Sequence, residues 1–263
     1  VIPVFLASLI EIDVPTVQPV VNQMVNGVDV RPHSCNTNQT MKLPYLFQVS
    51  LHCKIDGEWQ HSCGEVLGFN WISVASDEPT CSEHMECRVA LGKHTLNQID
   101  SGSAFMGSAN IVMHEEWDIL TLQNDTALIK LSSPFALSDT ITPACLPDRD
   151  VVLPHGTPCL VTGWGRLSTN GPAADILQQA FLPVVGHDVC SQPDWWNVLA
   201  TEKMVCAGGD GITAGCNRDS GGLLNCPNPD GSWDVHGIVS FGSGEGCNVL
   251  QKPTVFTQVR LYV

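Results

Sequence analysis

The sequence has few basic residues, with 12 Lys and Arg against 27 Asp and Glu, and a formal net charge of −15 at pH 7. This shortage of cations excludes nucleic acid as a partner, because phosphates are bound mainly by Lys and Arg. The chain also lacks an apolar run of the roughly 18 residues that a membrane helix needs. Its longest apolar stretch, residues 1–10, is interrupted by Pro3 and Ser8. We therefore expect neither a nucleic-acid nor a membrane partner.

Zinc-site spacing is absent as well, since none of the 12 cysteines forms a Cys-x-x-Cys pair. Zinc is therefore the weaker interpretation of these cysteines. Their wide spread, from Cys35 to Cys247, favours a disulfide framework in an oxidising compartment. Residues 1–10 lack a starting Met and a basic region, and we interpret them as the end of a secretory signal whose start is missing. A secreted, extracellular protein is expected.

Helical periodicity is scarce, and short apolar, β-branched runs recur instead. Most of these runs are bounded by Gly, Pro, Asn, Asp or Ser, which is typical of an all-β barrel or sandwich. A hydrophobic content of 43% is enough for a sizeable core. The expected strands are residues 47–53, 87–91, 110–113, 126–131, 159–162, 236–241 and 254–259. Residues 137–153 are a plausible connector between two halves.

Two glycosylation sequons are present, at Asn38 and Asn124. The first lies in a polar stretch that a surface loop could present for glycosylation. The second opens an apolar strand, and we interpret it as a chance match.

The most specific local signal for chemistry is the segment Gly215-Cys-Asn-Arg-Asp-Ser-Gly-Gly222. An Asp-Ser-Gly-Gly turn beside a cysteine can expose the Ser220 hydroxyl on a tight loop whose backbone amides converge on one point. A nucleophile and an oxyanion hole can be built together in this way. Taken alone, Ser220 could equally be an ordinary turn serine.

The rest of the chain favours the nucleophile, because from about Asn22 to Val263 it resembles the chymotrypsin-like (S1) serine proteases. Within that family it is most similar to the pancreatic elastase and chymotrypsin branch. The motifs that carry the resemblance, in order, are Arg31-Pro-His-Ser34, Gln48-Val-Ser-Leu51, His61-Ser-Cys-Gly64, Asn124-Asp125 with Ala127-Leu-Ile-Lys-Leu131, Thr162-Gly-Trp-Gly-Arg-Leu167, Trp195-Trp196, Met204-Val-Cys-Ala-Gly-Gly209, Gly237-Ile-Val-Ser-Phe-Gly242 and Lys252-Pro-Thr-Val-Phe-Thr257.

The resemblance implies two six-stranded antiparallel barrels with the active site in the cleft between them. It divides the chain into a signal remnant and propeptide-like segment (1–23), a first barrel (24–143) and a second barrel (144–263). Relatives continue beyond the position of Val263 into a C-terminal helix, so that helix is expected to be missing. A monomer without cofactors is expected, with peptide or protein substrates or inhibitors as partners.

The family acts through a Ser/His/Asp triad in which the histidine takes the serine proton. By resemblance, Ser220 is the nucleophile and Asp125 is the acid that orients the imidazole. The histidine should directly precede a cysteine in a Trp-x-x-Thr-Ala-Ala-His-Cys motif.

That histidine is missing from its expected place. Counting forward from Trp71 puts Asp77 in the histidine position, and counting back from Cys81 puts Thr80 there. The nearest imidazole, His84, lies beyond the cysteine, where the chain normally leads away from the cleft. Neither register supplies a base.

Two further departures concern the oxyanion hole and activation. The two oxyanion amides would be those of Ser220 and of the residue two before it, which is normally glycine and is Arg218 here. Activation normally follows cleavage after a basic residue and frees an amine that pairs with the equivalent of Asp219. The aligned junction here is Gln23-Met24, which a trypsin-like activator should ignore. In an uncut chain we expect Asp219 to turn outward.

The expected specificity pocket carries no carboxylate at its base and is open at its mouth, which favours medium to large apolar side chains. Its residues, by resemblance, are Ala214 and Gly215 at the base, Ser240, Phe241 and Gly242 along one wall, and Thr254 on the far side. Lys93 stands where calcium-binding relatives carry a glutamate, so no metal is expected.

The resemblance also implies the disulfides Cys63–Cys81, Cys159–Cys226, Cys190–Cys206 and Cys216–Cys247. The remaining cysteines, Cys35, Cys53, Cys87 and Cys145, could pair as Cys53–Cys87 and Cys35–Cys145.

Two functions stay open at this point. The first is a secreted protease homologue that is catalytically impaired. The alternative is an active endopeptidase that cuts after apolar residues, with residues 71–87 misread or His84 acting as base.

Overall fold

The computed structural model describes residues 48–67, 72–74, 86–138 and 140–263, and the description that follows concerns these residues. They contain twelve β-strands, one four-residue α-helix and two short 3₁₀ helices. The strands form two closed antiparallel barrels of six strands each. Among the described residues, no helix is long and apolar enough to cross a membrane.

The first barrel is built from the N-terminal strands and has the order β1-β2-β3-β6-β5-β4, with β4 pairing back to β1. Its strands are β1 (Gln48–Ile55), β2 (Glu58–Leu67), β3 (Ile72–Val74), β4 (Cys87–Leu91), β5 (Ala104–Met113) and β6 (Ala127–Leu131).

The second barrel has the order β10-β11-β12-β9-β8-β7 and closes through the pairing of β7 with β10. Its strands are β7 (Pro158–Gly163), β8 (Gln178–Val185), β9 (Met204–Ala207), β10 (Leu223–Pro227), β11 (Trp233–Phe241) and β12 (Thr254–Gln258). The helices are α1 (His187–Cys190), η1 (Asn197–Leu199) and η2 (Val259–Leu261).

Side chains on β6 alternate in the way that a half-buried strand predicts. Ala127, Ile129 and Leu131 are buried in the core of the first barrel, whereas the two residues between them are partly exposed. The period of two arises because successive side chains on a strand point to opposite faces. An alternating apolar pattern therefore places one face of β6 inside the barrel.

β1 is buried on both faces from Gln48 to Cys53. Val49 and Leu51 belong to the core of the first barrel. Gln48 points the other way, toward the second barrel, where the hydroxyl of Thr162 on β7 donates to its side-chain oxygen at 2.7 Å. Contact with the second barrel thus buries the face of β1 that would be exposed to solvent in an isolated barrel.

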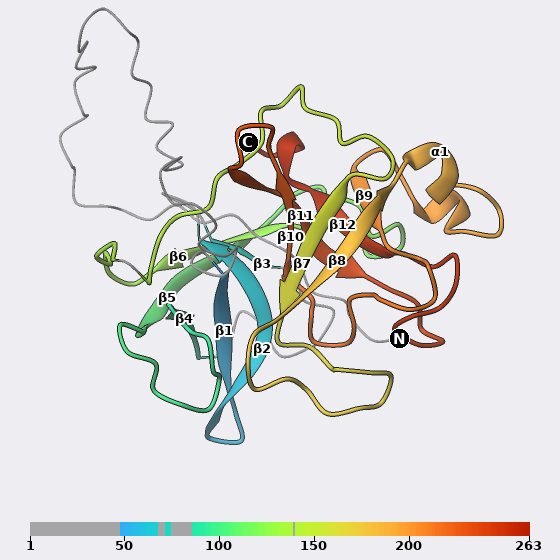
Figure 1. Ribbon diagram of the computed structural model, residues 1–263. Helices are drawn as coiled ribbons and strands as arrows, with labels where there is room; N and C mark the ends of the chain where they lie inside the picture. Colours follow the sequence, from blue (N-terminus) through green and yellow to red (C-terminus); the bar gives the residue numbers. More distant parts are fainter. Residues whose placement is uncertain (1–47, 68–71, 75–85, 139) are drawn as a thin grey trace, which may run out of the picture.

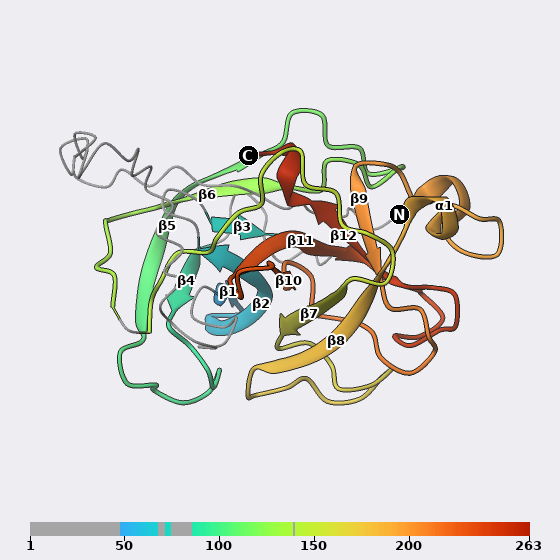
Figure 2. The same ribbon diagram turned by 45° about the horizontal axis from the view of Figure 1, so that its top comes forward.

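The two barrels lie side by side, with β1–β6 in blue to green and β7–β12 in yellow-green to red (Figure 1). The view turned by 45° shows the same separation, with α1 at the far side of the second barrel (Figure 2). The C-terminal segment returns toward the first barrel, because the Tyr262 hydroxyl donates to the Asn124 side-chain oxygen at 3.0 Å. The segment before β6 is therefore contacted by residues from the end of the chain.

The all-β, two-barrel prediction is confirmed. Each of the seven predicted apolar runs lies on a strand, namely β1, β4, β5, β6, β7, β11 and β12. The prediction for β5 was too short, since the strand begins at Ala104 and most of its residues are partly or fully exposed. The apolar pattern gave no signal for β2, which begins with the polar sequence Glu58-Trp-Gln-His-Ser62.

Candidate active site

Ser220 lies on a turn that enters β10, and the residue is only 6% exposed. The Gly64 amide of the first barrel donates to the Ser220 carbonyl oxygen at 3.0 Å. The Gly222 amide donates to the carbonyl of Asp219 at 2.7 Å and tightens the turn. A Cβ atom on Gly222 would lie 2.6 Å from the Thr162 carbonyl oxygen. The second glycine of the Ser-Gly-Gly sequence is therefore required by the close approach of β7.

Asp125 precedes β6, and the residue is 2% exposed. The hydroxyl of Ser240, on β11, donates to its carboxylate oxygen Oδ2. The hydroxyl of Thr257, on β12, donates to its backbone oxygen at 2.8 Å. An acid from the first barrel is thus fixed by two strands of the second.

Ser240 contacts one predicted triad member and shares a cavity with the other. Besides its bond to Asp125, it lines the same cavity as Ser220. The sequence placed Ser240 only on the wall of the specificity pocket, so its contact with Asp125 was missed. A serine beside a buried carboxylate gives no signal of its own in the sequence.

The side chain of Asn124 fixes the backbone directly before Asp125 through hydrogen bonds. The residue is 6% exposed and has a left-handed φ of 55°. Its amide donates to the Glu116 carbonyl at 2.8 Å, and its oxygen accepts from Lys203 and Tyr262, both at 3.0 Å. A buried amide with all these bonds is a poor glycan acceptor, in line with the interpretation of this sequon as a chance match.

The histidine position lies outside the described residues, because Asp77, Thr80 and His84 all fall in the range 75–85. Histidines within the described ranges have contacts of their own. His61 shares a 2.6 Å hydrogen bond with the hydroxyl of Ser50. Burial, followed by the charges of His52 and Arg218, lowers the pKa of His61 to about 3, so its imidazole is neutral at physiological pH.

Arg218 adopts φ = 71°, in the left-handed region that side chains other than glycine rarely occupy. The structure has the glycine-like conformation, which costs on the order of 1–3 kcal/mol for such a residue. Within the described part of the chain the Arg218 amide donates no hydrogen bond. It therefore has free donor capacity two residues before Ser220.

A cavity of about 170 Å³ opens beside Ser220. Gly215, Ser240, Phe241, Gly242 and Thr254 line it, and no carboxylate is among its described lining residues. Their role as a specificity pocket stays a prediction. The Gly215 amide donates to the Thr254 hydroxyl at 2.8 Å, which ties the base to the far wall. Such a space suits an uncharged side chain of medium size.

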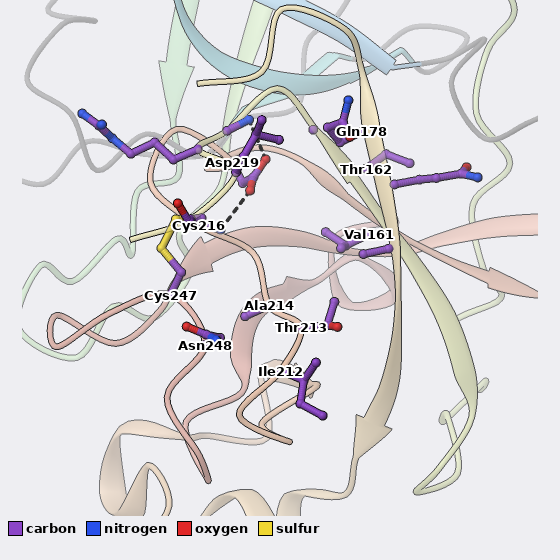
Figure 3. A pocket seen from close by; sticks show the side chains of 17 residues that line it. Val161, Thr162, Gln178, Ile212, Thr213, Ala214, Cys216, Asp219, Cys247 and Asn248 are labelled. Carbon is purple, nitrogen blue, oxygen red and sulfur yellow. Dashed lines mark hydrogen bonds between the residues drawn. A yellow bond between two sulfur atoms is a disulfide. The ribbon is translucent and has the colours of Figure 1, made fainter. Parts of the chain in front are cut away.

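Ala214, predicted at the base of the specificity pocket, is not among the described residues that line the cavity beside Ser220. This residue lines a second, adjoining cavity of about 280 Å³ and not the one beside Ser220. Figure 3 shows this second cavity, with Ala214 and Thr213 along its wall and the Cys216–Cys247 disulfide at its side. Its assignment to the base of the specificity pocket therefore stays a prediction.

Asp219 lies at one end of this second cavity (Figure 3). Its carboxylate accepts the amides of Gly165 and Cys216, both at 2.8 Å. Burial raises its pKa to about 6, although these two bonds oppose the shift. No ion pair of Asp219 occurs within the described residues. The expectation of an outward Asp219 is wrong for this structure, because two backbone amides hold the group inward; Met24 lies outside the described residues.

The segment that carries Gly165 is braced by the first barrel. Asp175 accepts the Asn97 backbone amide at 3.0 Å and its side-chain amide at 2.7 Å. Lys93, only 3% exposed, donates to the Gln98 carbonyl and pairs with Asp100 at 3.3 Å. The buried ammonium of Lys93 thus fixes the loop at residues 98–100, next to Asn97, which contacts the second barrel.

Within the described ranges, no group of three or more His, Cys, Asp or Glu side chains is placed to hold a metal ion.

Four disulfides join described cysteines, and all four were expected: Cys53–Cys87, Cys159–Cys226, Cys190–Cys206 and Cys216–Cys247. Cys145 is also disulfide-bonded. Its expected partner Cys35, like Cys81, lies outside the described residues, so the pairings Cys35–Cys145 and Cys63–Cys81 stay predictions.

Comparison with known proteins places this geometry in context. A sequence model of the trypsin family matches residues 33–263. The chain is 47% identical to chymotrypsin-C of Mus musculus over 251 residues, which cover 95% of the chain and 90% of that protein. It is 47% identical to chymotrypsin-C of Bos taurus over 261 residues, with 98% and 93% coverage. Identity to chymotrypsin-like elastase family member 3B of Macaca mulatta is 42% over 247 residues, with 92% and 91% coverage.

Proposed function

Because the chain belongs to the trypsin family of serine proteases, we propose that it is a secreted member that binds peptides in its cleft but hydrolyses them poorly. The family relationship supports peptide or protein substrates or inhibitors as partners. Disulfide bonds in both barrels support an extracellular site of action.

One observation carries the proposal of impaired activity. The nucleophile position and the acid position are occupied by Ser220 and Asp125, but the sequence offers Asp77 or Thr80 where the base is required. A serine hydroxyl needs an adjacent base to become a useful nucleophile. Loss of that base in a triad lowers the rate by ~10⁶-fold, which corresponds to about 8 kcal/mol.

Arg218 is a second, smaller impairment. A side chain at φ = 71° makes the oxyanion turn costly to hold. The donor itself is kept, because the Arg218 backbone holds the glycine-like conformation, so the impairment is limited to this strain. Because triad and oxyanion hole act as a unit, its effect adds little once the base is gone.

An active endopeptidase that cuts after apolar residues is the second candidate. Three observations favour it: the Arg218 backbone keeps a glycine-like conformation, Asp219 points inward, and an uncharged cavity lies beside Ser220. In that case the base must come from His84 or from a different reading of residues 71–87.

The test is turnover of peptide anilides with an apolar residue before the scissile bond, after removal of residues 1–23. We expect negligible hydrolysis and slow labelling of Ser220 by a fluorophosphonate, with Ser220→Ala as the blank. The variants Asp77→His and Thr80→His test which register can accept a base, and activity gained by either supports the proposal. A wild-type rate within tenfold of an active pancreatic elastase would contradict it.

A further inference from the structure

A stacked arginine lies on the outer face of the first barrel. The guanidinium of Arg88, on β4, lies 4.2 Å from the centre of the Trp59 ring and 4.0 Å from the centre of the Phe105 ring. Trp59 belongs to β2 and Phe105 to β5, so the group is held between side chains from two other strands. Such stacking fixes a planar cation in one orientation.

The donors of this guanidinium have no acceptor in the described part of the protein. Its Nε atom is buried without a hydrogen-bond partner, and the Arg88 side chain has no ion pair or hydrogen bond among the described residues. The carboxylate of Glu86 is near enough to raise the pKa of Arg88 slightly against the lowering effect of burial. That carboxylate, however, is bound by Lys54 at 2.9 Å.

An arginine in this state is unusual in a chain of net charge −15. Most buried or half-buried polar groups are paired, and an unpaired donor calls for an explanation. The residue is only partly buried and Phe105 is 44% exposed, so the site can be reached from solvent. The guanidinium is therefore both oriented and accessible.

The site is connected to the cleft through one row of side chains across the sheet. Arg88 pairs in register with His52 on β1, and His52 pairs with His61 on β2. Neighbouring strands lie about 4.8 Å apart, so this row spans about 10 Å. His61 in turn lies close enough to Arg218 for the arginine charge to lower its pKa. Arg88 therefore lies in the same row across the sheet as His61, about 10 Å from it.

We propose that Arg88, held between Trp59 and Phe105, binds the side-chain carboxylate of an acidic peptide segment. This site needs no catalysis, so it stands whether or not the chain hydrolyses peptides. A carboxylate is planar and can accept two parallel N–H bonds from one guanidinium. A phosphate dianion would be repelled more strongly than a carboxylate by the net charge of −15.

The flanking rings make the bond stronger than at an open surface. They exclude water from both faces of the guanidinium, and a charge-assisted hydrogen bond gains strength where water is excluded. They also offer apolar contact to the neighbours of the acidic residue. Binding should weaken with added salt, because the site remains within reach of solvent ions.

The test is a titration of the full chain with acetyl-Gly-Glu-Glu-Gly-amide, followed through the Nε–H resonances of its arginines. The peptide lacks an apolar residue for the cavity beside Ser220, and its blocked ends leave only side-chain carboxylates. We expect one arginine resonance, displaced by ring currents from Trp59 and Phe105, to shift saturably. The variant Arg88→Gln should lower the affinity by about tenfold or more, and Arg88→Lys by an intermediate factor, since Lys keeps the charge but not the planar fork.

Arg149→Gln is the matched control, because Arg149 is an exposed arginine on another surface, and it should bind as the wild type does. Equal unfolding midpoints for all variants show that folding is intact. The proposal is overturned if the Gln analogue acetyl-Gly-Gln-Gln-Gly-amide binds equally well. It is also overturned if Arg88→Gln binds like Arg149→Gln, or if no arginine resonance shifts saturably.

Discussion

The Asp219 carboxylate accepts the amide of Gly165, 54 residues earlier in the chain, at 2.8 Å. A Cβ atom at Gly165 would overlap that carboxyl group, so the close approach requires glycine. With the Cys216 amide on the other oxygen, the residue before Ser220 is held by two neutral donors. The cavity beside it leaves space for a cation that would neutralise the charge.

This arrangement predicts that a new N-terminal amine changes ligand binding. A chain that starts at residue 24 with Met24→Ile should bind a protein inhibitor of elastases several-fold more tightly than the full chain, by calorimetric titration. The reason is that an ammonium paired with Asp219 would raise the fraction of molecules with an ordered pocket. The same truncated chain with Asp219→Asn is the control and should lose the gain. Equal affinities of the truncated and full chains would mean that a new N-terminal amine does not change the pocket through Asp219.

Arg218→Gly should stabilise the protein. Relief of the left-handed strain gains about 1–3 kcal/mol, of which up to about 1 kcal/mol is lost to the greater freedom of glycine in the unfolded chain. A net gain of about 1 kcal/mol in the free energy of unfolding is expected, measured by urea denaturation. Arg218→Ala removes the same charge but keeps the strain, so it should show no such gain. Equal stability of the two variants would refute the strain argument.

Acidification should destabilise the protein through His236. Burial, with a smaller contribution from the charge of Arg260, lowers its pKa from 6.5 to about 4. The unfolded chain therefore binds the proton more readily, so the stabilisation is full above pH 6.5 and is lost as the pH falls through about 4. The loss is on the order of 3 kcal/mol. His52, whose pKa is also about 4, acts with the same sign.

The measurement is the free energy of unfolding from about pH 7 to about pH 4 for the wild type and for His236→Gln, which should show a flatter profile. Asp219 acts with the opposite sign in both proteins. Its folded pKa, about 6, exceeds the ordinary value of 3.8, so its contribution is present at low pH and lost as the pH rises through 6. If the free energy of unfolding changed with pH by the same amount in the two proteins, His236 would be excluded as a source of acid lability.

Lys93→Met should destabilise the fold by about 2 kcal/mol, because Asp100 and the Gln98 carbonyl would lose their buried cation. The double variant Lys93→Met, Asp100→Asn should recover part of this loss, since it leaves no unpaired charge. Thermal unfolding of the wild type, the two single variants and the double variant measures the coupling. Strict additivity of the two changes would show that the pair does not interact.

The sequence predicted the strands that bury one or both faces in a core. β6 could be read from its alternation, and β4 and β12 from short apolar runs between turn residues. β2 could not be read this way, because Glu58 and Gln60 are exposed to solvent and the described side chains between and after them are not part of a hydrophobic core. His61 on β2, for example, is enclosed by Ser50 and by the ring of Trp164 from the second barrel. Local pattern carries no information about such a remote partner.

The amino-acid order by itself determined the residue types that are available: a serine on a Gly-Gly turn, an acid before β6, cysteines that pair, and no histidine at the position where the resemblance predicts a base. Those properties depend on residue identity and on short-range spacing. Tertiary structure decided which groups meet. It joined Ser240 to Asp125 across 115 residues, turned Asp219 inward onto the Gly165 amide, and closed Trp59 and Phe105 over Arg88. These contacts follow from the closure of the two barrels and from their packing against each other, which bring strands together that are far apart in the chain.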